Sequence, residues 1–141
     1  AVDYEAELGV LIGTPAKDVP EADALAHVWG YTVVNDITAR DIQFSEAQWS
    51  RCKSFDGFTP NGPFVVTADE IGDPGDLHIW AVVDGQTVQD ASTSQMIRSV
   101  PALVASLSVS GGPRLLLLGG CPVSVGVGGS GGLPTHCRVL G

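Results

Sequence analysis

The alternation of apolar and polar residues at the start of the chain is the feature that most constrains the fold. Every second side chain between residues 2 and 12 is apolar, and acidic Asp3, Glu5 and Glu7 lie among the residues between them. Successive side chains of a β-strand point to opposite faces, so this period of two predicts a strand with an apolar face and an acidic face. The apolar face carries Val2, Tyr4, Ala6, Leu8, Val10 and Ile12. The two glutamates are then neighbours on one surface, where their charges repel unless water screens them or a cation lies between them.

Further strands are expected along the chain. The β-branched run YTVVNDI at 31–37 and the segment GPFVVT at 62–67 each read as a strand. The segment 77–91 reads as two strands joined at Asp84-Gly85, a dipeptide suited to a tight hairpin turn.

Two helices are expected. The first begins near Pro20 and ends at Gly30, and Glu21 and Asp23 in its first turn favour the positive end of a helix. Its apolar stripe consists of Ala22, Leu25, Ala26, Val28 and Trp29. The second begins near Ser99, with Pro101 in its first turn.

Strands and helices that do not alternate regularly indicate an α+β fold. A length of 141 residues fits a single domain over residues 1–141. Composition changes after residue 108, because nine of the 18 glycines lie between positions 111 and 132. This Gly-rich region is either a set of tight turns or a shortened connection.

The charge balance narrows the choice of partners. Sixteen acidic and seven basic residues give a formal net charge of −9, which argues against nucleic acid or an anionic membrane and favours cations. The sequence shows neither an apolar run of membrane-span length nor a secretory signal pattern, so a soluble cytoplasmic protein is expected. The cysteines and histidines are dispersed and show no disulfide framework or zinc-ligand spacing. They are Cys52, Cys121, Cys137, His27, His78 and His136.

Three carboxylates are candidates for a metal site. Glu5 and Glu7 share a predicted strand face, and Asp36 lies at the exit of the next predicted strand. Ends of adjacent strands can converge, and hard divalent cations take oxygen ligands. On the pattern alone, a solvated acidic strand face is the simpler interpretation.

Four segments together resemble the fumarylacetoacetate hydrolase family. They are VDYEAELGVLIG, GYTVVNDITARDIQ, QWSRCKSFDGFTPNGPFVVTADEI and TSQMIRSVPALVASLS, and the match runs through residues 2–108, whereas 109–141 resemble the family weakly. The resemblance implies an α+β fold with a rolled, mixed β-sheet and a few short helices, and a homodimer. It also implies that Glu5, Glu7 and Asp36 hold one divalent cation, Mg²⁺ or Mn²⁺, with Ca²⁺ as a further option.

The resemblance also assigns substrate-binding and catalytic residues. Arg40 and Gln43 match residues that line the substrate pocket, and Lys53 matches the lysine that binds the substrate carboxylate or polarises its oxygen. Cys121 takes the place of the family threonine that hydrogen-bonds substrate. The structural alternatives are a salt bridge of Arg40 with Asp41 or Asp36, and a solvated loop around Lys53.

The implied substrates are small 2-oxo or β-diketo acids whose C–C bonds are cleaved or whose double bonds are shifted. Fumarylacetoacetate, acylpyruvates and the 2-hydroxyhepta-2,4-diene-1,7-dioate of aromatic catabolism belong to this class. Oxaloacetate decarboxylation or tautomerisation is an alternative, as is a metal-binding pseudoenzyme or oligomer partner without turnover.

Two departures from the family pattern affect the expected activity. The family histidine that activates water lies in a short segment upstream of E-x-E, before the first residue printed here. The family Gly-Asp turn becomes Arg114-Leu115, and a Cys121 thiol is a weaker donor than a threonine hydroxyl. Residues 1–141 alone are therefore expected to show little or no hydrolase activity.

Overall fold

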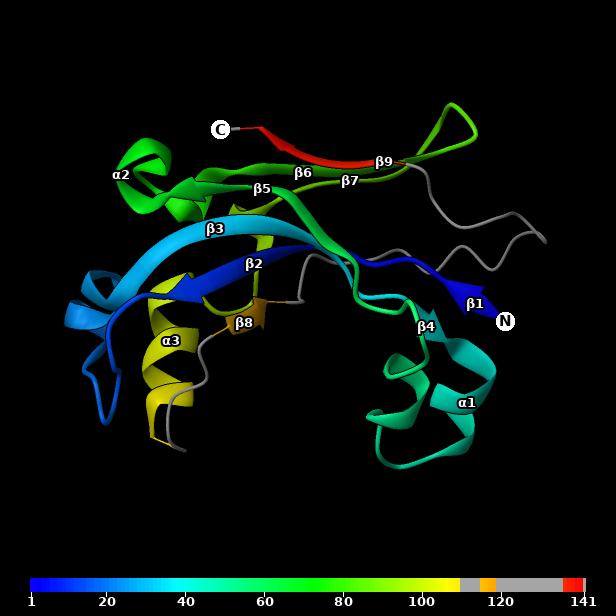
Figure 1. Cartoon of the computed structure of the whole chain (residues 1–141), viewed down its shortest axis with the longest axis horizontal. Coiled ribbons are helices and arrows are strands. Elements are labelled where there is room, and N and C mark those ends of the chain that lie inside the picture. Colours follow the sequence, from blue (N-terminus) through cyan, green and yellow to red (C-terminus); the bar gives the residue numbers. More distant parts are fainter. Residues whose placement is uncertain (110–114, 119–135, 141) are drawn as a thin grey trace.

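The computed structural model describes residues 1–109, 115–118 and 136–140, and these form an α+β fold of short helices and antiparallel strands (Figure 1). The strands are β1 (Val2–Asp3), β2 (Ala6–Ile12), β3 (Val28–Asn35), β4 (Thr38–Ala39), β5 (Asn61–Thr67), β6 (His78–Val83), β7 (Gln86–Ser92), β8 (Leu115–Leu118) and β9 (His136–Leu140). The α-helices are α1 (Arg40–Ser45), α2 (Ala68–Ile71) and α3 (Val100–Ser108). The 3₁₀ helices are η1 (Glu21–His27), η2 (Arg51–Lys53), η3 (Pro74–Asp76) and η4 (Thr93–Gln95).

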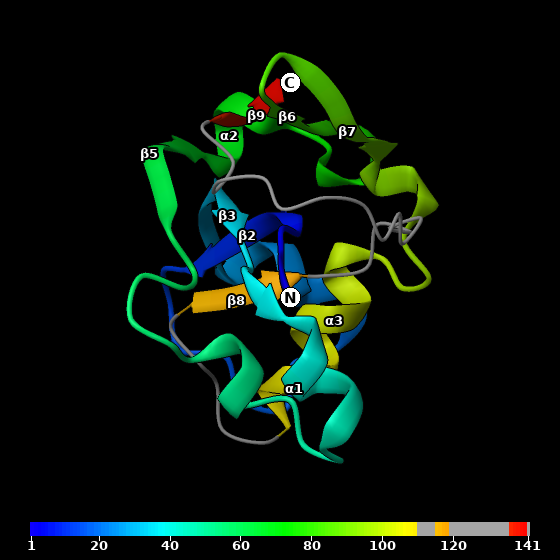
Figure 2. The same ribbon diagram turned by 90° about the vertical axis from the view of Figure 1, so that its right-hand side faces the viewer.

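Two sheets form the body of the described chain. The first has the strand order β5-β3-β2-β8 and the second β7-β6-β9, while β1 pairs separately with β4. The first sheet lies between the second sheet and the helices α1 and α3 (Figures 1 and 2). The α+β class is confirmed, but all strand pairs of the described residues are antiparallel, so the sheets there are not mixed.

The main core forms on β2. Leu8 and Val10 are fully buried and belong to one apolar cluster with Ile79 of β6 and with Val100 and Val104 of α3. The apolar face predicted for this strand is therefore confirmed at Ala6, Leu8 and Val10, whereas Val2 is exposed. Burial of this face against a sheet and a helix contributes about 1.5–3 kcal/mol for each large aliphatic side chain.

The predicted strand over residues 2–12 is interrupted at Tyr4 and Glu5. β1 pairs with β4, whereas β2 pairs with β3, so the chain leaves one partner and joins another between them. The backbone of Glu5 is held by the other chain segment instead of by a ladder. Its N–H donates to Asn35 Oδ1 at 3.1 Å, and its carbonyl accepts from the N–H of Asp36 at 2.9 Å.

The helix predicted from Pro20 to Gly30 is shorter and of a different type. η1 ends at His27, and Val28 and Trp29 belong to β3 because pairing with β2 overrides the local helical pattern. Gly30 lies inside β3 and does not end a helix. A Cβ at this position would lie 2.5 Å from the Val66 carbonyl oxygen, so glycine permits the close approach of β5.

The later predictions are confirmed. β6 and β7 form a hairpin at Asp84-Gly85, both of which have positive φ. α3 begins after Ser99, whose hydroxyl accepts a hydrogen bond from the N–H of Ala102 at 3.3 Å. Helix α1 was not predicted. Within the described ranges, the helices are all too short or too polar to span a membrane. The choice between tight turns and a shortened connection falls largely on 110–114 and 119–135, outside the described residues.

Candidate metal and substrate site

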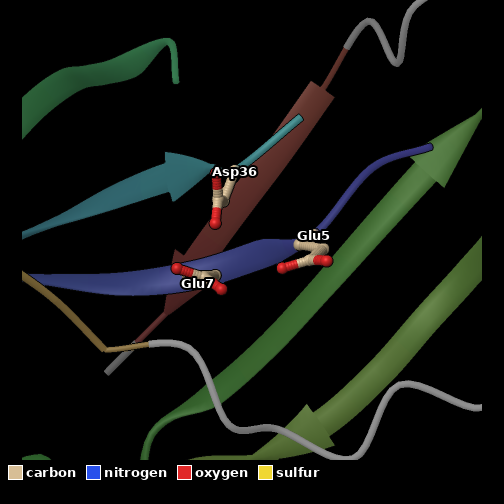
Figure 3. Close-up of side chains that lie close together, drawn as sticks. All are labelled: Glu5, Glu7 and Asp36. Atoms are coloured by element: carbon tan, nitrogen blue, oxygen red, sulfur yellow. The ribbon is translucent and has the colours of Figure 1, made fainter. Parts of the chain in front are cut away.

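Three carboxylates converge where β2 begins and β3 ends. Ala6 and Asn35 are cross-strand neighbours, and this register places Glu5 and Glu7, on either side of Ala6, next to Asp36. Figure 3 shows the three carboxylates turned toward one another. One ligand atom of each lies within 4.8 Å of the others, so they could hold one metal ion. We call Glu5, Glu7 and Asp36 the acidic cluster.

Lys53 of η2 reaches into the acidic cluster. Its Nζ lies 3.0 Å from Glu5 Oε2 and 2.5 Å from Asp36 Oδ2, and it donates to the Thr38 hydroxyl at 3.0 Å. Its side chain is only 22% exposed, so the alternative of a solvated loop is wrong. Thr38 is fully buried and donates to Glu5 at 3.2 Å, which links the ammonium group and this carboxylate.

Arg40 lies on the other side of Glu5. Its Nη1 is 2.7 Å from Glu5 Oε1, and its Nε donates to Asp3 Oδ2 at 2.9 Å. The expected alternative pairing of Arg40 with Asp41 or Asp36 is wrong, because its ion pairs are with Asp3 and Glu5, and Asp36 pairs with Lys53. Helix α1 begins at Arg40, which sets the direction of this side chain next to β1.

Gln43 lies one turn along α1 and accepts a hydrogen bond from Arg40 Nη1 at 2.8 Å. The pair is therefore preorganised, since the same guanidinium contacts both Glu5 and this amide. The three residues assigned to substrate by resemblance, Arg40, Gln43 and Lys53, all come from the chain between β4 and β5, and two of them contact the acidic cluster.

Burial perturbs one carboxylate strongly. Glu7 is 8% exposed, and burial, followed by the nearby charges of Asp36 and Glu5, raises its pKa from 4.5 to about 8. Lys53 lowers it only in part. For Lys53 itself, burial lowers the pKa, but hydrogen bonds to Asp36 and Glu5 outweigh it and leave the pKa raised. In the metal-free protein, Glu7 therefore carries its proton near neutral pH.

The residues present fit a hard divalent cation. All three members of the acidic cluster offer carboxylate oxygens, the ligand type that Mg²⁺ and Mn²⁺ prefer. With all groups ionised, the four acids including Asp3 carry −4, and Arg40 and Lys53 carry +2. The remaining −2 is the charge that one divalent cation neutralises. Ionising buried Glu7 is costly without such a cation. A bound metal ion would therefore stabilise the ionised form of the Glu7 carboxylate.

The other candidate residues lie elsewhere. His27 precedes β3 at the end opposite to Asp36 and contacts Thr14, so it does not belong to the cluster. His78 lies on β6 and contacts Asp90 at 2.7 Å. Cys121 falls outside the described residues.

Sequence reasoning missed several residues that support the cluster. Asn35 and Thr38 lie in the segment NDITARD, next to Asp36 in the sequence. This closeness was the signal that could have indicated their contacts with the cluster. Asp3 was placed on the acidic face but not paired with Arg40. Gln89, in β7, bonds to the backbone between Glu5 and Glu7 across 83 positions of sequence, and no local pattern indicates this contact.

Comparison with known proteins identifies the family of the chain. The sequence profile described as "Fumarylacetoacetate (FAA) hydrolase C-terminal" matches residues 1–120. A curated protein of Burkholderia multivorans, named only as a hydrolase, is 46% identical to the chain over 129 residues. The aligned residues make up 89% of this chain and 46% of the relative.

Two solved structures show the likeness in three dimensions. A fumarylacetoacetate hydrolase from Exiguobacterium antarcticum aligns with a TM-score of 0.79 and 39% identity, over 84% of this chain and 44% of that one. A 2-hydroxyhepta-2,4-diene-1,7-dioate isomerase from Mycobacterium marinum aligns with a TM-score of 0.78 and 43% identity, over 84% of this chain and 47% of that one. The chain spans less than half the length of these relatives. Because the profile covers most of the chain, including the acidic cluster, Arg40, Gln43 and Lys53, the protein belongs to the fumarylacetoacetate hydrolase family.

Proposed function

We propose that the chain carries the metal and substrate site of a divalent-metal-dependent hydrolase or isomerase acting on small 2-oxo or β-diketo acids. The observation that carries this proposal is the convergence of the acidic cluster with two half-buried cations, Lys53 and Arg40, at one sheet end. The relatives named above as a hydrolase and an isomerase support the general class of reaction.

The charged groups have different roles in binding. Glu5, Glu7 and Asp36 would hold Mg²⁺ or Mn²⁺, with Ca²⁺ as a further option. The bound cation would supply positive charge that polarises a substrate carbonyl oxygen. Lys53 brings a half-buried ammonium group whose donors already contact Glu5, Asp36 and Thr38, so its positive charge lies beside the cluster. Arg40 offers a planar fork suited to a carboxylate. Gln43 fixes the plane of that guanidinium through its 2.8 Å hydrogen bond.

The family resemblance implies the substrate class, and this arrangement of donors fits it. A 2-oxo acid presents a carboxylate next to a carbonyl, so one end can meet a guanidinium or ammonium group while the other is polarised. Negative charge that develops on the carbonyl oxygen during C–C cleavage or a proton shift then lies near Lys53. The candidate substrates are acylpyruvates, fumarylacetoacetate-like diacids and ring-cleavage dienoates.

Further proposals concern the domain, the assembly and the location of the protein. Residues 1–141 form one catalytic domain, with Cys121 near substrate, and the protein acts as a homodimer in the cytoplasm. These statements rest on the family resemblance and on the composition, and each can be tested separately by size measurement, localisation and assay.

Calorimetric titration with Mn²⁺ tests the metal site. The chain is expected to bind one equivalent, and Asp36→Asn is expected to bind at least tenfold more weakly because one carboxylate ligand is lost. Glu70→Gln is the matched control, since Glu70 is an exposed acid that contacts Thr67 and lies outside the cluster. Equal affinity of the wild type and Asp36→Asn would contradict the ligand assignment.

A turnover screen tests the reaction class. Acylpyruvates, fumarylacetoacetate-like diacids, ring-cleavage dienoates and oxaloacetate are offered to the Mn²⁺-loaded chain and to any longer protein that contains it. We expect hydrolysis or isomerisation by the longer protein. Full Mn²⁺ occupancy without turnover of any of these would instead favour a metal-binding protein without catalytic activity.

A further inference from the structure

Gln89 forms a contact that bridges the two sheets at the acidic cluster. It lies in β7, is 6% exposed, and is opposite Ala81 in the second sheet. Its Oε1 accepts a hydrogen bond from the N–H of Ala6 at 2.9 Å, and its Nε2 donates to the carbonyl of Ala6 at 2.7 Å. One side chain thus satisfies both backbone groups of a residue in the first sheet. Since Ala6 offers one donor and one acceptor, this pairing fixes the orientation of the amide.

The geometry of β2 explains why Ala6 needs such a partner. Asn35 is the cross-strand neighbour of Ala6, but it donates its own N–H to Pro60. The polar backbone groups of Ala6 therefore point to the other edge of β2. Along that edge, the described pairing with β8 begins at Leu8, two residues further on. Gln89 takes the place of a strand at the position between the two glutamates.

The contact acts on the peptide units that carry Glu5 and Glu7. The N–H of Ala6 belongs to the Glu5–Ala6 peptide and its carbonyl belongs to the Ala6–Glu7 peptide, and each peptide unit is planar. Asp36 holds the first of these units from the other side, because its N–H donates to the Glu5 carbonyl at 2.9 Å. The backbone that carries all three carboxylates is thus linked through the peptides that Gln89 fixes.

We propose that Gln89 is a positioning residue, which sets the relative orientation of Glu5 and Glu7 through the Ala6 backbone and so determines the affinity of the acidic cluster for a divalent cation. This inference rests on the proposed function, because it requires that the cluster binds metal. Groups that orient metal ligands without touching the metal typically change affinity 10–100-fold when removed.

Thr93 supplies a matched control. Its buried hydroxyl accepts from the N–H of Leu77 at 2.8 Å and donates to the carbonyl of Pro74 at 2.7 Å, so it also satisfies one backbone donor and one backbone acceptor. It does so between η3, η4 and the start of β6, away from the acidic cluster. Gln89→Met and Thr93→Val each leave two buried backbone groups without their side-chain partner.

Mn²⁺ titration of the three folded proteins separates positioning from stability. Both variants are expected to lower the melting temperature, but only Gln89→Met is expected to weaken Mn²⁺ binding, by about 10–100-fold. Binding by Gln89→Met within twofold of the wild type would overturn the inference and leave the proposed function intact. Failure of the wild type itself to bind Mn²⁺ would instead contradict the proposed function.

A measurement on the wild type keeps the inference testable if Gln89→Met does not fold. Coupling is reciprocal, so a contact that supports metal binding must be strengthened by the metal. Saturating Mg²⁺ is expected to slow hydrogen exchange of the Ala6 N–H at least tenfold more than that of the Leu77 N–H, which bonds to Thr93. Equal slowing of both amides would show only a general gain in stability and would overturn the inference.

Discussion

The end of the β2–β3 sheet and the segment 36–60 contribute to the site in opposite ways. The sheet end buries Glu7 next to an apolar core, and 8% of its surface remains exposed. The segment 36–60 exposes large aromatic side chains, with Phe44 77% and Trp49 58% exposed, yet it buries most of the Lys53 side chain. The sheet end thus presents the two glutamates, and the segment 36–60 contributes Asp36 together with the two cations.

This difference separates the two glutamates, although they are two residues apart. Glu5 has ion pairs with both Arg40 and Lys53, whereas Glu7 occurs in none of the ion pairs of the described residues. Charge neutralisation within the chain therefore favours one glutamate, and burial opposes ionisation of the other. We expect Glu7 to depend on a metal ion and Glu5 to depend on the segment 36–60.

Lys53→Met should have the largest effect. The variant removes the only N–H donors that contact both Glu5 and Asp36 among the described side chains, so charge on a substrate oxygen loses its stabilising partner. Loss of one such donor typically lowers kcat about 10²–10³-fold. Turnover is measured with the best substrate of the screen and with the active form of the protein.

Lys17→Met is the control for this variant. Lys17 is exposed and donates to the carbonyl of Val109, away from the cluster. Turnover of Lys17→Met should equal that of the wild type. If Lys53→Met retained wild-type kcat, the segment 36–60 would be a structural support only.

Glu7→Gln should have the next largest effect, on metal binding. An amide oxygen is a weaker ligand for a hard cation than a carboxylate and carries no charge. We expect Mn²⁺ affinity to fall roughly 10²-fold, as measured by calorimetry or by the electron paramagnetic resonance signal of free Mn²⁺. Glu70→Gln again serves as the control, and unchanged affinity of Glu7→Gln would remove Glu7 from the ligand set.

The same variant should stabilise the metal-free protein. The pKa of Glu7 is raised in the folded state to about 8 from 4.5, so ionisation opposes folding. This penalty is absent below about pH 4.5, grows as the pH rises, and is complete above about pH 8. Glu7→Gln should therefore raise the melting temperature at pH 8, by on the order of 10 °C, and leave it nearly unchanged at pH 4.5.

Mn²⁺ should reverse the order of stability at pH 8, because a ligand that binds the folded state stabilises it. The wild type gains from the metal and Glu7→Gln gains little. Thermal unfolding of the wild type and of Glu7→Gln is measured at pH 4.5 and at pH 8, each with Mn²⁺ and with a chelator. A melting temperature of metal-free Glu7→Gln below that of the wild type at pH 8 would show that the Glu7 carboxylate is stabilising.

Local pattern predicted those parts of the fold that local physics determines. The period of two in β2, the Asp84-Gly85 turn and the Ser99 cap act over a few residues, and the structure bears each of them out. The break at Tyr4 and Glu5 and the strand through Val28 depend on pairing with distant segments. Single-residue propensities contain no information about such pairing.

The same division holds for the site. The strand pattern allowed Asp36 to converge with the two glutamates, but only the resemblance turned this convergence into a prediction. The resemblance supplied the roles of Lys53 and Arg40, and the structure places both at the cluster. The role of Gln89 could not be predicted, because its contact joins two sheets. In the sequence, this glutamine cannot be told apart from any other polar residue of a hairpin.

The smallest effect is expected where a cation of segment 36–60 faces solvent. Arg51 forms an ion pair with Glu46, and the arginine side chain is 62% exposed. Exposed pairs gain little because water screens both charges and the side chains lose freedom when they pair. Arg51→Met should therefore shift the melting temperature by no more than about 1 °C and leave Mn²⁺ affinity unchanged.

Arg40→Met is the matched buried change, since Arg40 is 14% exposed and contacts both Asp3 and Glu5. It should lower the melting temperature by several degrees, because the two carboxylates lose their buried partner. Equal melting temperatures for the two variants would show that the contrast between the exposed surface of this segment and its cluster-facing side does not hold.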